Sequence, residues 1–185
     1  MATTRQVNIG PERGTLVLHT SRRGLASQAG HDLTIQIDRW SGTVSLGDDL
    51  SEGSVEVTID TSSLRVTAGT GGVKPLSERD KREIYTIANK LIGGGEAKYV
   101  SSSVTAATNG GTVTGTLSLH GAERPVELTV TDLGGNHYRG TATIVQSEFG
   151  IKPYTGFLGA LKVSDGVEVV ADVRLTDGAA PAEPA

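Results

Sequence analysis

Apolar residues recur at every second position over most of this chain, and this period restricts the fold more than any other feature. In LTIQID, Leu33, Ile35 and Ile37 alternate with polar residues, and in SVEVTID Val57 and Ile59 do the same. Such alternation is typical of antiparallel strands with one face in a core and one in water. We count about nine such runs. They cover residues 14–21, 33–38, 40–46, 54–60, 98–107, 112–119, 125–131, 138–146 and 167–175.

Glycine and asparagine mark the turns between these runs. Asn109-Gly110-Gly111 and Gly134-Gly135-Asn136 each separate two runs at hairpin distance, and Asp165-Gly166 precedes the last run. These residue types adopt the left-handed backbone that tight turns need. The order of the runs therefore predicts a sheet in which chain neighbours are mostly paired.

One segment has a helical period instead. Four apolar residues between Ile84 and Leu91 follow the spacing of one helix face, so we predict a helix at about residues 78–91. Ser77 is a suitable N-cap for it. The glycine-containing stretch before the helix, residues 67–75, is predicted to be a loop.

The predicted fold is all-β with one helix. About eight antiparallel strands either close into a barrel or stack as a sandwich, and the apolar composition fits both. Aromatic residues make up only 4% of the chain, and an eight-stranded barrel with few bulky fillers has room for one small ligand. We predict one domain at residues 14–176, with a disordered segment at 1–13 and a disordered Ala/Pro-rich tail at 177–185.

Composition excludes several partners and sites. The net charge of −4 comes without a basic stripe, which argues against nucleic acid as a partner. The absence of cysteine excludes a disulfide framework, thiolate zinc sites and a cysteine nucleophile. Because the N-terminal residues lack an apolar signal segment and no apolar run is long enough to span a bilayer, the expected location is the cytoplasm.

Motifs of common enzyme classes are missing. The chain has no G-x-S-x-G, no H-E-x-x-H and no phosphate-binding loop, and its histidines lack zinc-ligand spacing. The carboxylates Asp32, Asp38, Asp60 and Asp80 are scattered along the chain. We therefore expect a protein that is not an enzyme, with no cofactor and no metal. A hydrolase or isomerase that uses His31 with a nearby carboxylate is the less favoured enzymatic alternative.

Two features concern the ends of the predicted barrel. His31 begins an inward-facing row, where it either contacts a polar ligand head group or is a structural histidine bonded to its neighbours. Both phenylalanines of the chain, Phe149 and Phe157, lie within residues 148–166. This apolar, glycine-containing stretch is either a lid or entrance at the barrel mouth, or a loop that packs its own side chains into the core.

Several short motifs resemble the YceI-like family of polyisoprenoid-binding, lipocalin-like proteins. In order they are GHDLTIQIDRWSGTV, SVEVTIDTSSL, ERD at 78–80, GTLSLHGAERPVELTV, SEFGI and VSDGVEVVADV, and together they extend through most of residues 14–175. The resemblance implies an extended eight-stranded antiparallel β-barrel whose apolar tunnel holds a long isoprenoid or similar lipid. It also implies a homodimer in many members.

We therefore predict non-enzymatic binding, transport or storage of a long apolar lipid, such as a polyisoprenoid or an isoprenoid quinone. Transient membrane contact is compatible with this function. The alternative is a protein–protein interaction module, a dimer or partner scaffold with a filled barrel. The predicted ligand-binding residues are His31 at a tunnel end, Leu33, Ile35, Ile37, Val57, Ile59, Leu117, Leu119 and Ile144 in the lumen, and Phe149, Tyr154, Phe157 and Leu158 at the mouth.

Overall fold

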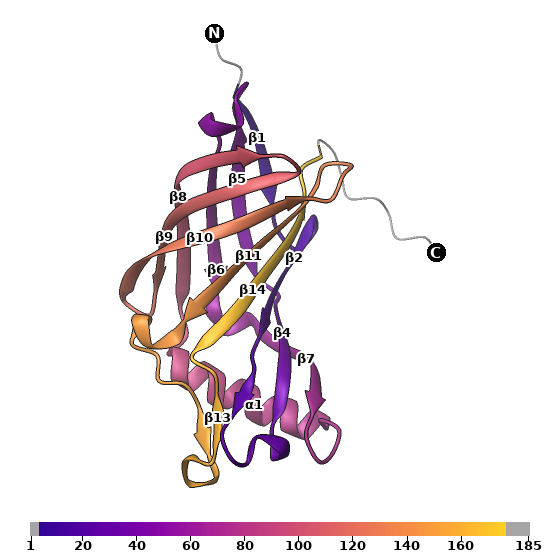
Figure 1. Cartoon of the computed structure of the whole chain (residues 1–185), viewed down its shortest axis with the longest axis vertical. Coiled ribbons are helices and arrows are strands. Elements are labelled where there is room, and N and C mark those ends of the chain that lie inside the picture. Colours follow the sequence, from indigo (N-terminus) through magenta and orange to yellow (C-terminus); the bar gives the residue numbers. More distant parts are fainter. Residues whose placement is uncertain (1–3, 177–185) are drawn as a thin grey trace.

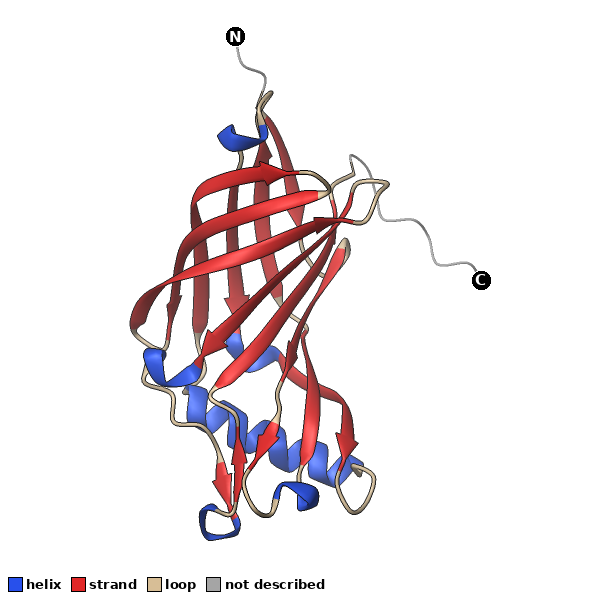
Figure 2. Ribbon diagram, in the orientation of Figure 1, coloured by secondary structure: helices blue, strands red, loops and turns tan. Residues whose placement is uncertain are grey.

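The computed structural model describes residues 4–176. It is mostly β with one α-helix, and its main antiparallel sheet is strongly curled around a common axis (Figure 1, Figure 2). A small three-stranded sheet lies at the lower end in this view, near the helix. The predicted fold class is confirmed, although the main sheet has eleven strands rather than eight.

Two sheets and one α-helix make up the fold. The main sheet has, in order of hydrogen-bonded neighbours, β1 (Arg5–Ile9), β5 (Trp40–Leu46), β6 (Ser54–Asp60), β8 (Glu96–Ala107), β9 (Gly110–Leu119), β10 (Ala122–Asp132), β11 (His137–Val145), β14 (Gly166–Arg174), β2 (Gly14–His19), β4 (His31–Ile37) and β7 (Leu64–Gly71). The small sheet has β12 (Thr155–Gly156), β13 (Leu161–Val163) and β3 (Arg22–Arg23). The helices are α1 (Glu78–Ile92) and the short 3₁₀ turns η1 (Ser27–Ala29), η2 (Leu50–Glu52), η3 (Thr61–Ser63), η4 (Gln146–Phe149) and η5 (Phe157–Gly159).

The higher strand count arises because three long strands are each interrupted once. Residues 31–46 form one stretch, β4 followed by β5. One edge of this stretch pairs with β1 along β5 and with β2 along β4, since Ile9 lies opposite Gly42 and Val17 lies opposite Gln36. The other edge of that stretch pairs with β6 and then β7. Each of three interrupted strands is thus recorded as two segments: β1 with β2, β4 with β5, and β6 with β7. When each of these pairs is counted as one strand, the eleven segments become eight strands, here called paths. Each path then has a neighbour on both sides, as the predicted eight-stranded circuit requires.

The two end strands of the sheet correct two predictions. Residues 1–13 are not wholly disordered, because β1 pairs with β5 and buries Val7 and Ile9, which are 2% and 5% exposed. Its two apolar positions give a weak pattern, and backbone pairing supplies the rest of the stabilisation. β7 extends to Gly71, inside the predicted loop at 67–75, because its backbone pairs with β4. The predicted tail, residues 177–185, lies outside the described residues.

The predicted helix is confirmed as α1. Ser77 and Asp80 form a reciprocal capping box at its start, and Gly93 ends it in the left-handed conformation with φ of 84°, which glycine adopts without a steric penalty. Ile84, Ala88 and Ile92 pack against the buried residues of the sheet. The helix lies across the lower end of the curled sheet (Figure 1).

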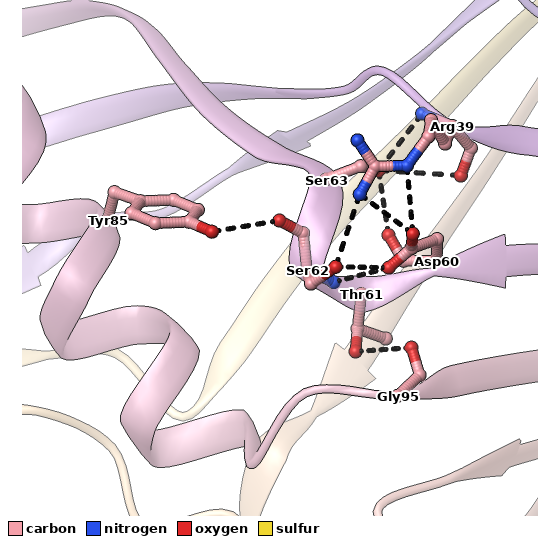
Figure 3. A network of polar contacts seen from close by, with 7 residues as sticks. All are labelled: Arg39, Asp60, Thr61, Ser62, Ser63, Tyr85 and Gly95. Atoms are coloured by element: carbon pink, nitrogen blue, oxygen red, sulfur yellow. Dashed lines mark hydrogen bonds and ion pairs between the residues drawn. The ribbon is translucent and has the colours of Figure 1, made fainter.

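A polar network holds the interruption between β6 and β7 (Figure 3). The Arg39 guanidinium donates to Asp60 Oδ2 at 2.9 Å, and the Ser62 amide donates to Asp60 Oδ1 at 2.9 Å. Hydrogen bonds from Ser62 and Arg39 lower the pKa of Asp60. The network therefore fixes the bend with an ionised carboxylate at its centre.

The same network ties the helix to the sheet. The Tyr85 hydroxyl on α1 donates to the Ser62 carbonyl at 3.2 Å, and the Thr61 hydroxyl donates to the Gly95 carbonyl at 2.8 Å (Figure 3). Gly95 follows α1 and precedes β8. The middle of α1 and the residues that follow it are thus connected to the bend, which fixes where α1 lies relative to the strands.

Inward apolar side chains form two clusters. The first includes Ile35, Ile37 and Trp40, and the second includes Tyr99 and Leu117. Residues of β6 and the end of α1 pack against both clusters. The two clusters are therefore linked through β6 and the end of α1.

Candidate ligand cavity

A cavity of about 1060 Å³ runs through the interior of the curled sheet. All eleven strands of the main sheet and α1 contribute to its lining. The lining includes exposed residues at opposite ends, since Val73 is 80% exposed and Leu50 is 53% exposed. The lumen is therefore not filled by side chains, and it reaches the surface of the protein.

The middle of the cavity has apolar walls. The inward rows that alternation predicts line the cavity, and so do His31 and Tyr154. These residues come from β4, β6, β9, β11 and the segment before β12. The lining residues of the predicted lumen set are Leu33, Ile35, Ile37, Val57, Ile59, Leu117, Leu119 and Ile144.

Three predicted mouth residues are not part of the lining. Phe149 is 1% exposed and packs in the second cluster, and its carbonyl oxygen lies 3.0 Å from His120 Nδ1. Of the two alternatives for residues 148–166, Phe149 therefore fits the second, a loop that packs its own side chains into the core. Phe157 is 66% exposed and Leu158 is fully exposed, because the left-handed backbone at both positions turns them outward.

Sequence reasoning missed several lining residues. Trp40 and Tyr99 belong to inward rows that the alternation in WSGTVSL and KYVSSSV already contains. The apolar face of α1 was predicted as a helix face but not as a wall of the site, and Ile87 and Leu91 from it line the cavity. A two-residue period cannot show that a helix closes a space between strands, because this depends on tertiary packing.

Tyr99 is the main polar group in the second cluster, and it is satisfied within the protein. Its hydroxyl lies 3.1 Å from the Val113 carbonyl and 3.2 Å from the Val126 carbonyl. Burial and, secondarily, the charge of Glu127 raise the pKa of Tyr99 to about 12. The phenol therefore stays neutral and acts as a structural donor rather than as a base.

Polar groups gather at the lower end of the cavity. His31 Nε2 lies 2.7 Å from the Lys74 carbonyl, and since a carbonyl only accepts, Nε2 carries the hydrogen. In the neutral ring Nδ1 is then an acceptor. Arg22 also lines this end and donates from its guanidinium to the Gly30 carbonyl at 2.6 Å. His31 thus has both a structural partner and a place in the lining.

The scattered carboxylates do not converge. Asp38 is paired with Arg65, Asp60 with Arg39, and Asp32 lies 3.7 Å from Arg22. Asp80 accepts hydrogen bonds from Ser77, which lower its pKa. No group of three or more potential ligands within residues 4–176 could hold a metal ion. In the same part of the chain, no helix is both long and apolar enough to cross a membrane.

The sequence of this chain matches the YceI-like domain over residues 15–175. The chain belongs to the YceI-like family. This agrees with the resemblance found in the motifs and with the curled antiparallel sheet. No curated protein sequence gives a match.

Two solved structures show the same fold at low identity. BcnA from Burkholderia cenocepacia is 19% identical, with a TM-score of 0.63 over 86% of this chain and 94% of that one. A mutant CJ YceI protein with a monobromobimane guest is 15% identical, with a TM-score of 0.54 over 75% and 81% of the two chains. A polyisoprenoid binding domain from Saccharophagus degradans, implicated in plant cell wall breakdown, is 14% identical, with a TM-score of 0.49 over 93% and 99%.

Proposed function

We propose that this protein binds one long apolar lipid in its cavity and acts as a carrier or store rather than as an enzyme. The observation that carries this proposal is a continuous apolar lumen of about 1060 Å³ that every strand of the main sheet lines. At roughly 30 Å³ per non-hydrogen atom, this volume has room for roughly 35 atoms. A polyisoprenoid or an isoprenoid quinone tail of about seven isoprene units is of this size.

Burial of apolar surface supplies the affinity. Transfer of apolar surface from water contributes about 25 cal/mol per Å² before the entropy of immobilising the chain is subtracted. The walls are formed by branched aliphatic side chains such as Val57 and Ile144, which offer no directional polar contact. Such a site selects length and flexibility in a ligand, and it tolerates variation in the pattern of double bonds.

The lower end of the cavity supports an orientation for the ligand. His31 Nδ1 is free to accept a hydrogen bond, because Nε2 is committed to the Lys74 carbonyl. We infer that the ligand carries a hydroxyl or a similar hydrogen-bond donor at its head. Its tail then extends along the apolar lumen, away from His31. A long prenol alcohol fits this arrangement better than the alkane of the same length.

Fluorescence of Trp40 tests the function. The chain has one tryptophan, and it lines the cavity, so the emission has a single source at the site. We expect a saturable, one-to-one change in emission with prenols up to about 35 carbons and a weaker response to longer chains. The alkane of equal length serves as the matched control for the head group. Folded protein that gives no change with any long-chain ligand would overturn the proposal.

A second candidate function is an interaction module or homodimer that uses Phe157 and Leu158. Their exposure favours it. Light scattering separates the two functions: replacement of both residues by asparagine dissociates a dimer built on this turn, whereas it leaves the lipid-induced Trp40 signal intact if the cavity is the functional site. The cytoplasmic location also stays a prediction, for cell fractionation to test.

A further inference from the structure

Three loops meet at the lower end of the molecule, beside the polar end of the cavity (Figure 1). They are residues 22–30, 72–77 and 150–163. Lys162 of β13 lies directly opposite Arg23 of β3, and the Ala26 amide donates to the Ala160 carbonyl at 2.9 Å. The bond between His31 and the Lys74 carbonyl brings the third loop to the same place. We call this surface the loop face.

The loop face exposes large apolar side chains. Leu25 and Leu158 are fully exposed, Val73 is 80% exposed and Phe157 is 66% exposed. They stand on three turns, with Phe157 and Leu158 adjacent in η5, rather than in strands where alternation forces one side outward. Apolar residues gathered on one exposed surface typically mark a binding site for another molecule.

In η5 the backbone at two of these residues has an unfavourable left-handed conformation that directs their side chains outward. Phe157 has φ of 48° and Leu158 has φ of 55°, a region that large L-residues rarely occupy. Such conformations are destabilising and are found chiefly where function requires them. Here the conformation presents a phenyl ring and an isobutyl group to the surroundings of the protein.

The loop face is also basic, in a chain whose net charge is −4. The three loops contain five basic residues and no acidic residue. Arg22 is offset by Asp32 at 3.7 Å, whereas the other four have no ion pair within residues 4–176. These four are Arg23, Lys74, Lys152 and Lys162.

Two details of this charge point to an external anion. Arg23 and Lys162 are directly cross-strand, and like charges in that position repel one another. At the opposite end, residues 47–53 contain three acidic residues and no basic one. The neighbouring helix α1 is nearly balanced, with four basic and three acidic residues. The loop face therefore carries a net positive charge, in contrast to the acidic turn at the opposite end.

We propose that the loop face docks on an anionic lipid bilayer and that lipid passes between the bilayer and the cavity through this end. The proposal rests on the lipid-binding function proposed above. Apolar tips that enter the interface, together with basic residues that meet anionic head groups, are the two signals that bind a protein reversibly to a membrane. A second copy of this chain is a poorer occupant, because a symmetric contact would bring the unpaired cations together.

The geometry connects the docking surface to the cavity. Val73 is exposed on the loop face and also lines the cavity, and Leu161 and Lys162 of β13 line it as well. Docking therefore places the polar end of the lumen against the lipid head groups. A ligand whose head lies near His31 would leave or enter without passing its tail through water.

Vesicle flotation of the full chain tests the proposal. The parent protein should float with phosphatidylcholine vesicles that contain phosphatidylserine, and binding should weaken with salt and with pure phosphatidylcholine. The double variant Phe157→Asn, Leu158→Asn removes the apolar tip at positions where asparagine tolerates the left-handed backbone. We expect its vesicle affinity to fall by about tenfold or more. The matched control is Leu133→Asn, which removes an exposed leucine, 45% exposed, that follows β10.

A charge variant gives a second test. Arg23→Gln with Lys162→Gln removes the cross-strand repulsion, so we expect unchanged or higher thermal stability together with about tenfold or greater loss of affinity for the anionic vesicles. A merely structural role for the pair would predict no change in flotation. Loss of stability without loss of flotation would contradict the assignment.

The outcomes separate docking from the proposed function. A tip variant that floats like the parent overturns docking, as does equal binding to neutral and anionic vesicles. A tip variant that dissociates a dimer, with flotation unchanged, makes the second copy the occupant and also overturns docking. If Trp40 responds to soluble prenol while the parent protein never floats, only docking fails. If Trp40 never responds, the lipid-binding function fails whatever the flotation result.

Discussion

Gly140 offers a way to shorten the cavity without disturbing the fold. It lies on β11 between the lining residues Tyr138 and Ala142 and itself lines the lumen. A Cβ atom built at Gly140 meets nothing within 4 Å, so the position faces open space. Substitution Gly140→Phe therefore projects a side chain into the cavity, rather than into a packed core where added atoms are destabilising.

The size of the effect follows from the cavity volume. A benzyl group adds about seven carbon atoms, or roughly 200 Å³, which is about a fifth of the 1060 Å³ available. A ligand that fills the lumen loses the same number of buried carbon atoms, worth up to about 6 kcal/mol at about 0.8 kcal/mol each. Because part of the tail can extend from an open end, we expect a loss of at least about 2 kcal/mol, or about 30-fold in Kd.

The assay is a Trp40 fluorescence titration with prenols of increasing length. Gly140→Phe should weaken binding of the longest well-bound prenol and leave a prenol shorter by about two isoprene units unaffected. The control is Thr141→Phe on the next residue of the same strand, which is not part of the lining. Equal affinity of Gly140→Phe and the parent protein for the full-length ligand would refute the assignment of the lumen as the binding site.

Three further predictions concern the walls and the bend. Tyr99→Phe should lower the free energy of unfolding by about 1 kcal/mol, because two strand carbonyls lose their donor. The pKa of Tyr99 is raised to about 12 from 10.0, so the phenol ionises first in the unfolded state, and the parent protein should lose stability above about pH 10. Chemical denaturation from about pH 9 to 12 should show a smaller loss of stability in Tyr99→Phe than in the parent protein. Gly115→Ala should destabilise by about 1–3 kcal/mol, because the new Cβ would clash with the Val100 carbonyl oxygen. An unchanged melting temperature would contradict this. The pKa of Asp60 is lowered in the folded protein, so the stabilisation by its carboxylate is present above its ordinary pKa and lost as pH falls through the lowered pKa. Asp60→Asn should therefore reduce the fall in melting temperature at acid pH. An equal fall in the parent protein and the variant would contradict the role of the network.

Alternation alone was enough to identify the strands that bury one face. The nine predicted runs correspond to β2, β4, β5, β6, β8, β9, β10, β11 and β14. The two strands of the main sheet that it missed, β1 and β7, are the ends of the hydrogen-bonded order. Their apolar rows are short, with Val7 and Ile9 in one and Leu64 and Val66 in the other. Pairing with a neighbour along the backbone determines such strands, and a single-sequence pattern does not contain it.

The site was predictable in its middle and not at its ends. Inward positions of long strands, such as Ile35 and Leu117, follow from period two. The ends depend on loops, where a side chain such as Phe149 turns into the core while Phe157 turns out. The concentration of aromatic side chains in residues 148–166 was informative, but their direction was set by backbone angles that composition does not encode.

Native mass spectrometry of freshly purified protein, followed by organic extraction, tests the central claim most directly. The account predicts an adduct of several hundred daltons on one chain, which extracts as an isoprenoid or acyl lipid and which Gly140→Phe replaces with a shorter one or loses. A bare mass that persists after incubation with long-chain prenols, in protein that remains folded, would contradict a lipid-binding lumen.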